Sequence, residues 1–214
     1  EAYIEQGYNI IFGTTFGYLD AMAEMAEEYP DVIFLHCSGY LKNDTNFGNY
    51  FGKMYQPRYL SGLAAGAMTE SNKIGYVAAF PIPEVIRGIN AFATGVKEVN
   101  PDATVEVVWT FTWFGPEAET QAANALLETG VDVLAQHQDS PSTGIAAEAA
   151  GAKWISYNTA YGQEAAPGAF VTAPVWDWGP YYVDVVESII NDEFLAEAYW
   201  GGMETGLVSL YELT

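Results

Sequence analysis

The stretch that decides the fold is residues 74–99, IGYVAAFPIPEVIRGINAFATGVKEV. It opens with a short apolar run, and from Pro83 onward apolar side chains recur at the i, i+3 and i+4 spacing of a helix. A proline suits the first turn of a helix, and the neighbouring Glu84 suits the positive end of the helix dipole. The stretch therefore predicts a buried strand followed by an amphipathic helix.

The same alternation runs along most of the chain. Gly130 and Gly151 stand where a helix that has just ended needs a left-handed residue. Regular alternation of strands and helices is typical of α/β architecture with parallel sheets. Strands are predicted at 8–12, 31–37, 74–78, 104–109, 131–136 and 153–157, and helices at 18–29, 55–70, 83–99, 116–129, 142–150 and 180–190.

The predicted elements group into two lobes. Residues 74–171 contain strand–helix pairs in uninterrupted succession, enough for one compact sheet with helices on both faces. Residues 1–73 and 172–214 are expected to form the other lobe, so that the chain crosses between lobes near Lys73 and Thr172. Such a topology predicts a cleft between the lobes, with ligands bound beyond the carboxyl ends of the strands.

The composition of the chain limits the classes of function that it fits. The 214 residues include 7 basic and 28 acidic side chains, a net charge of −21, and half of the residues are hydrophobic. Such a negative field repels phosphate backbones and anionic lipids, which disfavours binding to nucleic acids or membrane surfaces. The single cysteine, Cys37, cannot form an internal disulfide and suits an inert core position. No apolar stretch approaches the ~20 residues of a membrane span.

Motifs of catalysis are missing from the sequence. It contains no GxSxG, GxxxxGK[ST], HExxH or CxxC pattern, and its two histidines are too far apart to suggest a metal site. His137 and Asp139 could be a catalytic pair, but an i, i+2 spacing at a strand end favours hydrogen bonding to a ligand, or helix capping by Asp139 and Ser140. We expect no catalytic residue, no metal and no cofactor.

Aromatic and short polar side chains gather instead in the turns after the predicted strands. Flat rings offer stacking area, and Asp, Asn and Ser offer directional hydrogen bonds, so together they suit a flat heterocycle. Each aromatic residue alone is also suited to plain core packing. The candidate ligand-binding residues are Phe16, Trp113, Asp139, Ser140, Asn158, Trp176, Asp177 and Trp178.

Several motifs resemble those of the basic membrane protein family. The run YQPRYLSGLAAG at 55–66, followed by KIGYV at 73–77, is similar to the family signature. The resemblance implies a substrate-binding protein of an ABC importer for purine nucleosides and related bases, with an α/β, two-lobed type I periplasmic-binding-protein fold. Residues 176–182, WDWGPYY, resemble a subgroup associated with free purine-type bases. Further matches lie at 83–87, 100–101 and 130–133, and at Asn158.

The sequence departs from the family pattern in ways that bear on the ligand. Asn158-Thr159-Ala160 stands where the family has a GYNSD turn, so a carboxylate is missing, and Trp176 stands where nucleoside-binding relatives carry a lysine. Both differences weaken binding to ribose hydroxyls and favour a flat base. From the resemblance, the chain is also expected to lack the family's first strand–helix unit, its lipid-bearing N-terminal cysteine and its C-terminal segment.

Binding of a purine-like base gives each candidate residue an expected role. Phe16 and Trp113 are expected to sandwich the ring, Asp139 to accept a hydrogen bond from it, and Asn158 to donate and accept, while Asp177 and Trp178 line the floor beside the hinge. The implied location is periplasmic or at the extracellular face, with a lipid anchor or the importer permease as the only link to the membrane. Alternatives are a sugar-binding receptor, a ligand-sensing regulatory module of the same fold, and an enzyme acting on a nucleoside or sugar.

Overall fold

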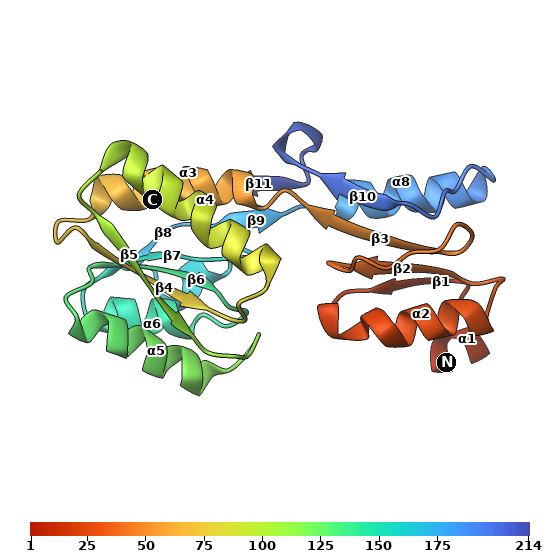
Figure 1. The fold of residues 1–214 in the computed structure, drawn as a ribbon, viewed down its shortest axis with the longest axis horizontal. Helices are drawn as coiled ribbons and strands as arrows, with labels where there is room; N and C mark the ends of the chain where they lie inside the picture. The colour runs from red at the N-terminus through yellow and green to blue at the C-terminus, as the bar shows by residue number, and fades with distance from the viewer. The chain divides into compact units, whose positions relative to one another are not determined.

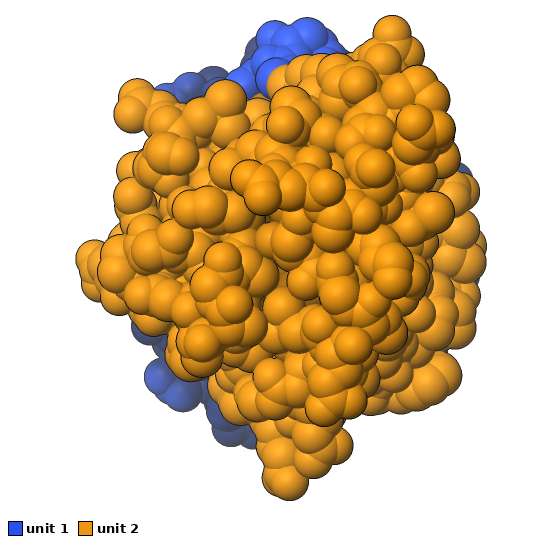
Figure 2. All heavy atoms as spheres, turned by 90° about the vertical axis from the view of Figure 1, so that its left-hand side faces the viewer, with its two compact units in different colours: residues 1–53, 178–207 blue, residues 54–177, 208–214 orange.

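The computed structural model describes residues 1–214, which form two compact units. Unit 1 comprises Glu1–Lys53 and Trp178–Leu207, and unit 2 comprises Met54–Asp177 and Val208–Thr214. Figure 2 shows the surface of unit 2 in orange, with unit 1 in blue. Each unit is built around its own parallel sheet, so the predicted α/β class is confirmed.

Unit 2 contains a five-stranded parallel sheet in the order β5-β4-β6-β7-β8. Helices α3 and α4 cover one face, and α5 and α6 cover the other (Figure 1). Strands β9 and β11 form a separate antiparallel pair. The elements are α3 (Tyr55–Met68), β4 (Lys73–Ala78), α4 (Pro83–Val99), β5 (Thr104–Trp109), α5 (Pro116–Glu128), β6 (Val133–His137), α6 (Ser142–Ala149), β7 (Lys153–Ile155), α7 (Gly162–Ala165), β8 (Phe170–Thr172), β9 (Pro174–Trp176) and β11 (Val208–Leu210).

The central strands of unit 2 are buried on both faces. In β4, Tyr76 packs with Phe92 of α4, whereas Val77 packs with Leu126 of α5, and none of these side chains is more than 2% exposed. Successive side chains of a strand point to opposite faces, so a strand covered by helices on both sides needs an apolar residue at almost every position. This explains the continuous apolar run at 74–78.

Helices α3 and α4 pack with their backbones very close together. A Cβ atom on Gly62 would lie 2.1 Å from the carbonyl oxygen of Phe92, and one on Gly95 would lie 2.1 Å from the carbonyl oxygen of Tyr59. Only glycine fits at either position. This close contact makes α3 part of unit 2.

The predicted lobe boundaries near residues 73 and 172 differ from the observed ones. The chain passes between the units after Lys53, after Asp177 and again after Leu207. The first boundary lies before α3 because this helix packs on α4, and the later ones differ because β9 and β11 pair within unit 2. The helix at 55–68 therefore belongs with residues 74–171 and not with the chain before it.

Unit 1 contains a four-stranded parallel sheet in the order β1-β2-β3-β10. Leu19 and Met22 of α2 pack against Phe34 and Phe47 of the sheet. A second cluster is aromatic: the rings of Tyr50 and Tyr181 stack at 4.8 Å, and Tyr182 and Trp178 join them. The elements are α1 (Ala2–Glu5), β1 (Ile10–Gly13), the 3-10 turn η1 (Phe16–Tyr18), α2 (Leu19–Glu28), β2 (Ile33–Cys37), β3 (Phe47–Gly52), α8 (Gly179–Ile190), β10 (Ala198–Gly201) and η2 (Met203–Thr205).

Strand β3 is absent from the sequence-based prediction. Its sequence, FGNYFG, has two glycines and an asparagine, which are all poor strand formers. Gly48 is needed because a Cβ there would lie 2.9 Å from the carbonyl oxygen of Glu197, just before β10. The tertiary contact therefore overrides local propensity.

The predicted helix ends are largely confirmed. Pro83 and Pro116 open α4 and α5, and Gly130 and Gly151 adopt φ values of +90° and +72° just after α5 and α6. None of the helices is both long enough and apolar enough to cross a bilayer.

Candidate functional site

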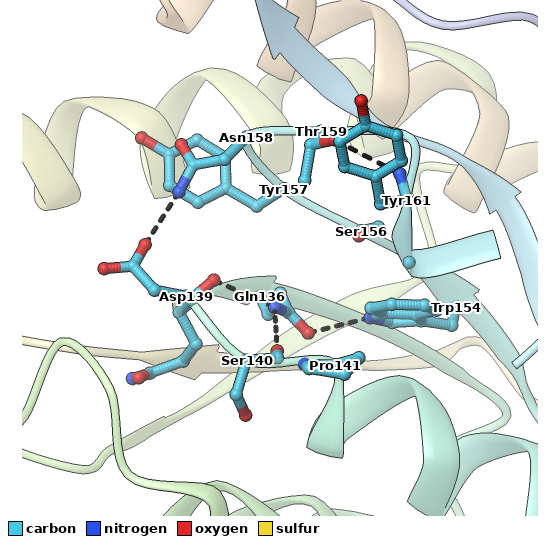
Figure 3. A pocket seen from close by; sticks show the side chains of 12 residues that line it. Gln136, Asp139, Ser140, Pro141, Trp154, Ser156, Tyr157, Asn158, Thr159 and Tyr161 are labelled. Atoms are coloured by element: carbon cyan, nitrogen blue, oxygen red, sulfur yellow. Dashed lines mark hydrogen bonds between the residues drawn. The ribbon is translucent and has the colours of Figure 1, made fainter. Parts of the chain in front are cut away.

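A pocket of about 240 Å³ lies in unit 2 beyond the carboxyl ends of β6 and β7. Figure 3 shows the turn after β6 and the segment after β7 facing one another across it. This is the edge of a parallel sheet where ligands are expected to bind. The lining contains one carboxylate and no Lys or Arg; its residues are Gln136, Gln138, Asp139, Ser140, Pro141, Trp154, Ser156, Tyr157, Asn158, Thr159, Tyr161 and Gly162.

Three predicted residues form a hydrogen-bonded chain at this pocket. Trp176, at the end of β9, donates its indole N–H to Oδ1 of Asn158 at 3.0 Å. Asn158 donates from Nδ2 to Oδ1 of Asp139 at 2.7 Å (Figure 3). Asn158 has a φ of +67°, a left-handed conformation that Asn tolerates better than most residues. The chain joins the segments that follow β6, β7 and β8.

The environment of Asp139 disfavours its charged form. Desolvation by the surrounding protein raises the pKa of Asp139, and the negative charges of Glu119 and Glu84 raise it further. The hydrogen bond from Asn158 acts in the opposite direction. The pKa of this carboxyl therefore lies above that of an ordinary aspartate, so Asp139 becomes neutral at a higher pH than an ordinary aspartate does.

Ser140 is tied to a buried carboxylate on α5. Its hydroxyl donates to Oε2 of Glu119 at 2.5 Å, and the backbone N–H of Gly115 donates to Oε1 at 3.0 Å. Burial raises the pKa of Glu119, although both hydrogen bonds oppose this. Ser140 also accepts a longer bond of 3.3 Å from the backbone N–H of Ser142, which is part of the predicted capping role, although Pro141 is the N-cap residue of α6.

Gln136 forms the floor of the pocket. Its Oε1 accepts the indole N–H of Trp154 at 2.9 Å. Its Nε2 donates to the carbonyl oxygens of Gln138 and Ser140 at 2.9 and 2.8 Å. One buried amide thus fixes the backbone of the turn that carries Asp139 (Figure 3).

Arg58 supports the site from α3. The guanidinium donates from Nη1 to the Gln136 carbonyl at 2.7 Å and lies 4.0 Å from the ring centroid of Tyr157. On the same side, Nε2 of His137 lies 3.5 Å from Oε1 of Glu84. Burial lowers the pKa of His137 despite this pairing, and the charge of Arg58 lowers it as well.

His137 and Asp139 do not form a pair. His137 faces Glu84, whereas Asp139 is bonded to Asn158. No group of three or more His, Cys, Asp or Glu side chains is arranged to hold a metal ion.

The sequence missed Arg58, Gln136 and Glu119. Arg58 could have been found, since it falls on the same helical face as Ser61, Gly62 and Ala65, all small and buried, so that an arginine there must be buried too. Gln136 sits inside an apolar strand, where a polar residue needs internal partners. Glu119 has no such signal, because an acidic residue in a first helical turn is ordinarily exposed.

The other predicted site residues are divided between the units. Trp113 is half-buried, with its ring centroid 5.1 Å from that of Phe80, and its carbonyl accepts the backbone N–H of Asp139 at 3.0 Å. Asp177 is exposed at the end of one segment of unit 2. Phe16 and Trp178 belong to unit 1, where Trp178 lies 5.2 Å from Tyr50 between ring centroids. The sandwich of a ring between Phe16 and Trp113 stays a prediction.

A family of known proteins matches this chain along its whole length. Residues 1–214 match the family described as ABC transporter substrate-binding protein PnrA-like, the Bmp family. The chain belongs to this family. The resemblance to basic membrane proteins is thereby confirmed, and the proteins that the chain matches are named as binding proteins and not as enzymes.

Two relatives cover nearly all of the chain. A Haloferax volcanii protein named as a putative ABC transporter glucose-binding protein is 49% identical over 212 residues, covering 99% of this chain and 54% of that protein. A purine-binding protein of Brucella abortus is 38% identical over 213 residues, covering 97% of this chain and 59% of that protein. The chain thus spans between half and two thirds of the length of these relatives.

Solved structures show the same fold. An ABC transporter solute-binding protein from Conexibacter woesei superposes with a TM-score of 0.78 at 22% identity, covering 100% of this chain and 72% of that chain. This likeness confirms the periplasmic-binding-protein fold class expected from the resemblance.

Proposed function

We propose that this chain binds a purine-type base or nucleoside as part of an extracytoplasmic solute-binding protein that serves an ABC importer. The observation that carries the proposal is the Asp139 carboxylate, held at the pocket by Asn158 in a lining without any cationic side chain. A carboxylate accepts hydrogen bonds from ring N–H and amino groups, which purine-type bases offer along their edges. The purine-binding relative supports the same ligand class.

The pocket disfavours phosphorylated ligands. Its only charged lining residue is acidic, and the acidic side chains of Glu119 and Glu84 lie close enough to Asp139 to raise its pKa. A phosphate placed there would meet an acidic side chain and no Arg or Lys side chain that could bind it. The proposal is therefore restricted to uncharged bases and nucleosides.

Aromatic stacking is the second element of the proposal. The backbone carbonyl of Trp113 accepts the backbone N–H of Asp139, so the two residues are neighbours in the fold. Stacking of a base on an aromatic ring contributes about 1–3 kcal/mol. Phe16, Trp178 and Asp177 are proposed to complete the binding surface, and Ser140 to contribute through the turn that it braces.

Glucose is the second candidate ligand, because the relative at 49% identity carries that name. A sugar requires a hydrogen-bond partner for each of its hydroxyl groups, since an unpartnered polar group in a closed site is costly. Much of the polar lining is already committed within the protein: the Gln136 amide, the Trp154 indole and the Ser140 hydroxyl all have internal partners. This favours a base, which needs fewer partners.

The remaining parts of the proposal concern the cellular setting. We propose a periplasmic or extracellular location, a permease as the partner that receives the ligand, and a lipid anchor outside this chain. Membership of an ABC transporter substrate-binding family supports this setting.

Two measurements test the ligand class. Mass spectrometry of small molecules that co-purify with the protein is expected to find a purine-type compound. Calorimetric titration with adenine, hypoxanthine, adenosine and glucose is expected to show binding of at least one purine. Recovery of glucose together with binding of glucose alone would refute the purine proposal and establish the second candidate. Recovery of a chemically changed ligand after incubation would contradict a binding role.

A further inference from the structure

We infer that Asn158 and Trp176 are positioning residues, which act on the ligand through Asp139 and not by contact of their own. In this arrangement the carboxylate of Asp139 presents its free oxygen to an N–H group on the edge of the ligand. The inference rests on the proposed function, since it concerns the same pocket. It replaces the expected role of Asn158 as a donor and acceptor toward the base.

The amide of Asn158 can take only one orientation between its two neighbours. The indole N–H of Trp176 can only donate, so it must meet the amide oxygen, and an ionised carboxylate can only accept, so it must meet the amide nitrogen. A flipped amide would oppose donor to donor and acceptor to acceptor. The two bonds therefore fix the orientation of the side chain, with its amide groups directed at partners within the protein.

The backbone on which this chain of bonds is built is also fixed. Asn158 forms a parallel β-bridge with Val175, directly beside Trp176, and Trp176 pairs with Val208 across the β9–β11 ladder. The turn that carries Asp139 is held by the amide of Gln136. A precise second layer of this kind is what holds a binding group in a single geometry.

Asp139 is exposed, and one of its carboxylate oxygens has no partner within the protein. Its Oδ1 accepts from Asn158, whereas Oδ2 makes no hydrogen bond within the protein. Acidic groups face it from α4 and α5, at Glu84 and Glu119, and Tyr157 lies on the neighbouring segment. With acidic neighbours and no cationic lining residue, the bond from Asn158 is what favours the ionised form.

The free carboxylate oxygen of Asp139 determines which edge of a ligand can bind to it. Only a group that donates a hydrogen bond, such as an exocyclic amino group or a ring N–H, can pair with the free oxygen. An edge that presents only acceptors, or a negative charge, is repelled. The ligand class is therefore a neutral heterocycle with an N–H group on the edge that enters unit 2.

The titration of Asp139 in the unliganded protein tests the positioning role. We expect the carboxyl-carbon NMR signal of Asp139 to titrate at higher pH in Trp176→Phe, and at higher pH still in Asn158→Gly, because each change weakens or removes the bond that favours the charged form. Glycine keeps the positive φ at position 158 without strain. Trp109→Phe, a matched change in β5, is expected to leave the titration of Asp139 unaltered.

Calorimetry with adenine across pH tests the effect on binding. Wild-type affinity is expected to fall on acidification, and this fall to begin at higher pH in both variants, with a loss of about three- to tenfold near neutrality. If Asn158→Gly lowers affinity equally at every pH while Asp139 titrates as in wild type, Asn158 is a direct ligand contact and the inference is wrong. If wild-type protein binds no base, the proposed function fails, and the NMR titration still decides the positioning role.

Discussion

Ser140 connects the candidate pocket to a carboxylate that is completely buried. Glu119 is 0% exposed and has two hydrogen-bond donors, the Ser140 hydroxyl and the backbone N–H of Gly115. A hydrogen bond to a charged group contributes about 1.5–3 kcal/mol, and leaving a buried carboxylate short of a partner costs at least as much. Ser140 therefore stabilises unit 2 in addition to lining the pocket.

We expect Ser140→Ala to lower the free energy of unfolding by about 2 kcal/mol, because Oε2 of Glu119 loses its donor. Urea denaturation measures this difference. Ser142→Ala is the matched control: it removes a hydroxyl 3.0 Å from Ser140 and keeps the bond to Glu119, so a loss below about 1 kcal/mol is expected. Equal losses in the two variants would show that the buried carboxylate does not depend on Ser140.

At the scale of single residues, the sequence reveals the polar side chains at strand ends better than the buried side chains that support them. Asp139, Ser140 and Asn158 were predictable because short polar side chains directly follow apolar strands, and all three line the pocket. The supports on the interior, Arg58 and Glu119, are charged residues in helical patterns. The small residues on the same face of α3 signal the burial of Arg58, whereas the burial of Glu119 depends on tertiary packing that no local pattern encodes.

Among the elements, the contact between helices α3 and α4 contains glycines that serve different purposes. A Cβ atom on Gly95 would lie 2.1 Å from a backbone oxygen of α3, which cannot move independently of its helix. A Cβ atom on Gly88, in the same helix, would have its nearest neighbour at 3.8 Å, the Cγ atom of Arg58. The first glycine is a packing requirement, whereas the second leaves room for a methyl group.

Gly95→Ala is expected to lower the free energy of unfolding by more than about 2 kcal/mol, since the two helices must separate. Gly88→Ala is expected to be neutral or to raise it by up to about 1 kcal/mol, because alanine is the better helix former. Chemical denaturation of both variants makes the comparison. A large loss in Gly88→Ala or none in Gly95→Ala would mean that the helix contact is looser than described.

Elements with a strong hydrophobic period were predictable from the sequence, whereas features that depend on close approach of two backbones were not. The strand at 74–78 and the helix at 83–99 correspond closely to β4 and α4. Strand β3 and the assignment of α3 to unit 2 both depend on glycines that allow backbones to approach, at Gly48 and Gly62. Glycine in a sequence signals freedom or a break, and not which partner fills the space.

For the whole molecule, both histidines resist protonation. His36 donates from Nε2 to the carbonyl oxygen of Thr15, and burial lowers the pKa of His36. Burial also lowers the pKa of His137. Because the unfolded chain takes up protons at the ordinary histidine pKa and the folded one does not, stability is complete above that pKa and decreases as pH falls below it.

We therefore expect the free energy of unfolding to decrease between about pH 7.5 and about pH 5.5. In the double variant His36→Gln/His137→Gln this decrease is expected to be much smaller, because glutamine fills similar space, can donate to Thr15 and does not titrate. Urea denaturation at both pH values gives the slopes. The same slope in the double variant would place the pH dependence on other groups.

The overall class could be predicted from the alternation of patterns, and the function class from motif resemblance. Composition disfavours a nucleic-acid partner through the excess of 28 acidic over 7 basic side chains. It did not identify the ligand, since ligand choice depends on which polar atoms stay free after internal bonding. That information appears only when the internal bonds of Asn158 and Gln136 are seen.

Asp139 is proposed to accept a hydrogen bond from a neutral base, and calorimetric titration of adenine into wild-type protein and Asp139→Asn tests this most directly. We expect saturable binding by wild type and a loss of about tenfold or more in Asp139→Asn. Asp102→Asn, at an exposed position in the same unit, is expected to bind as wild type does. Undiminished affinity in Asp139→Asn would contradict the claim.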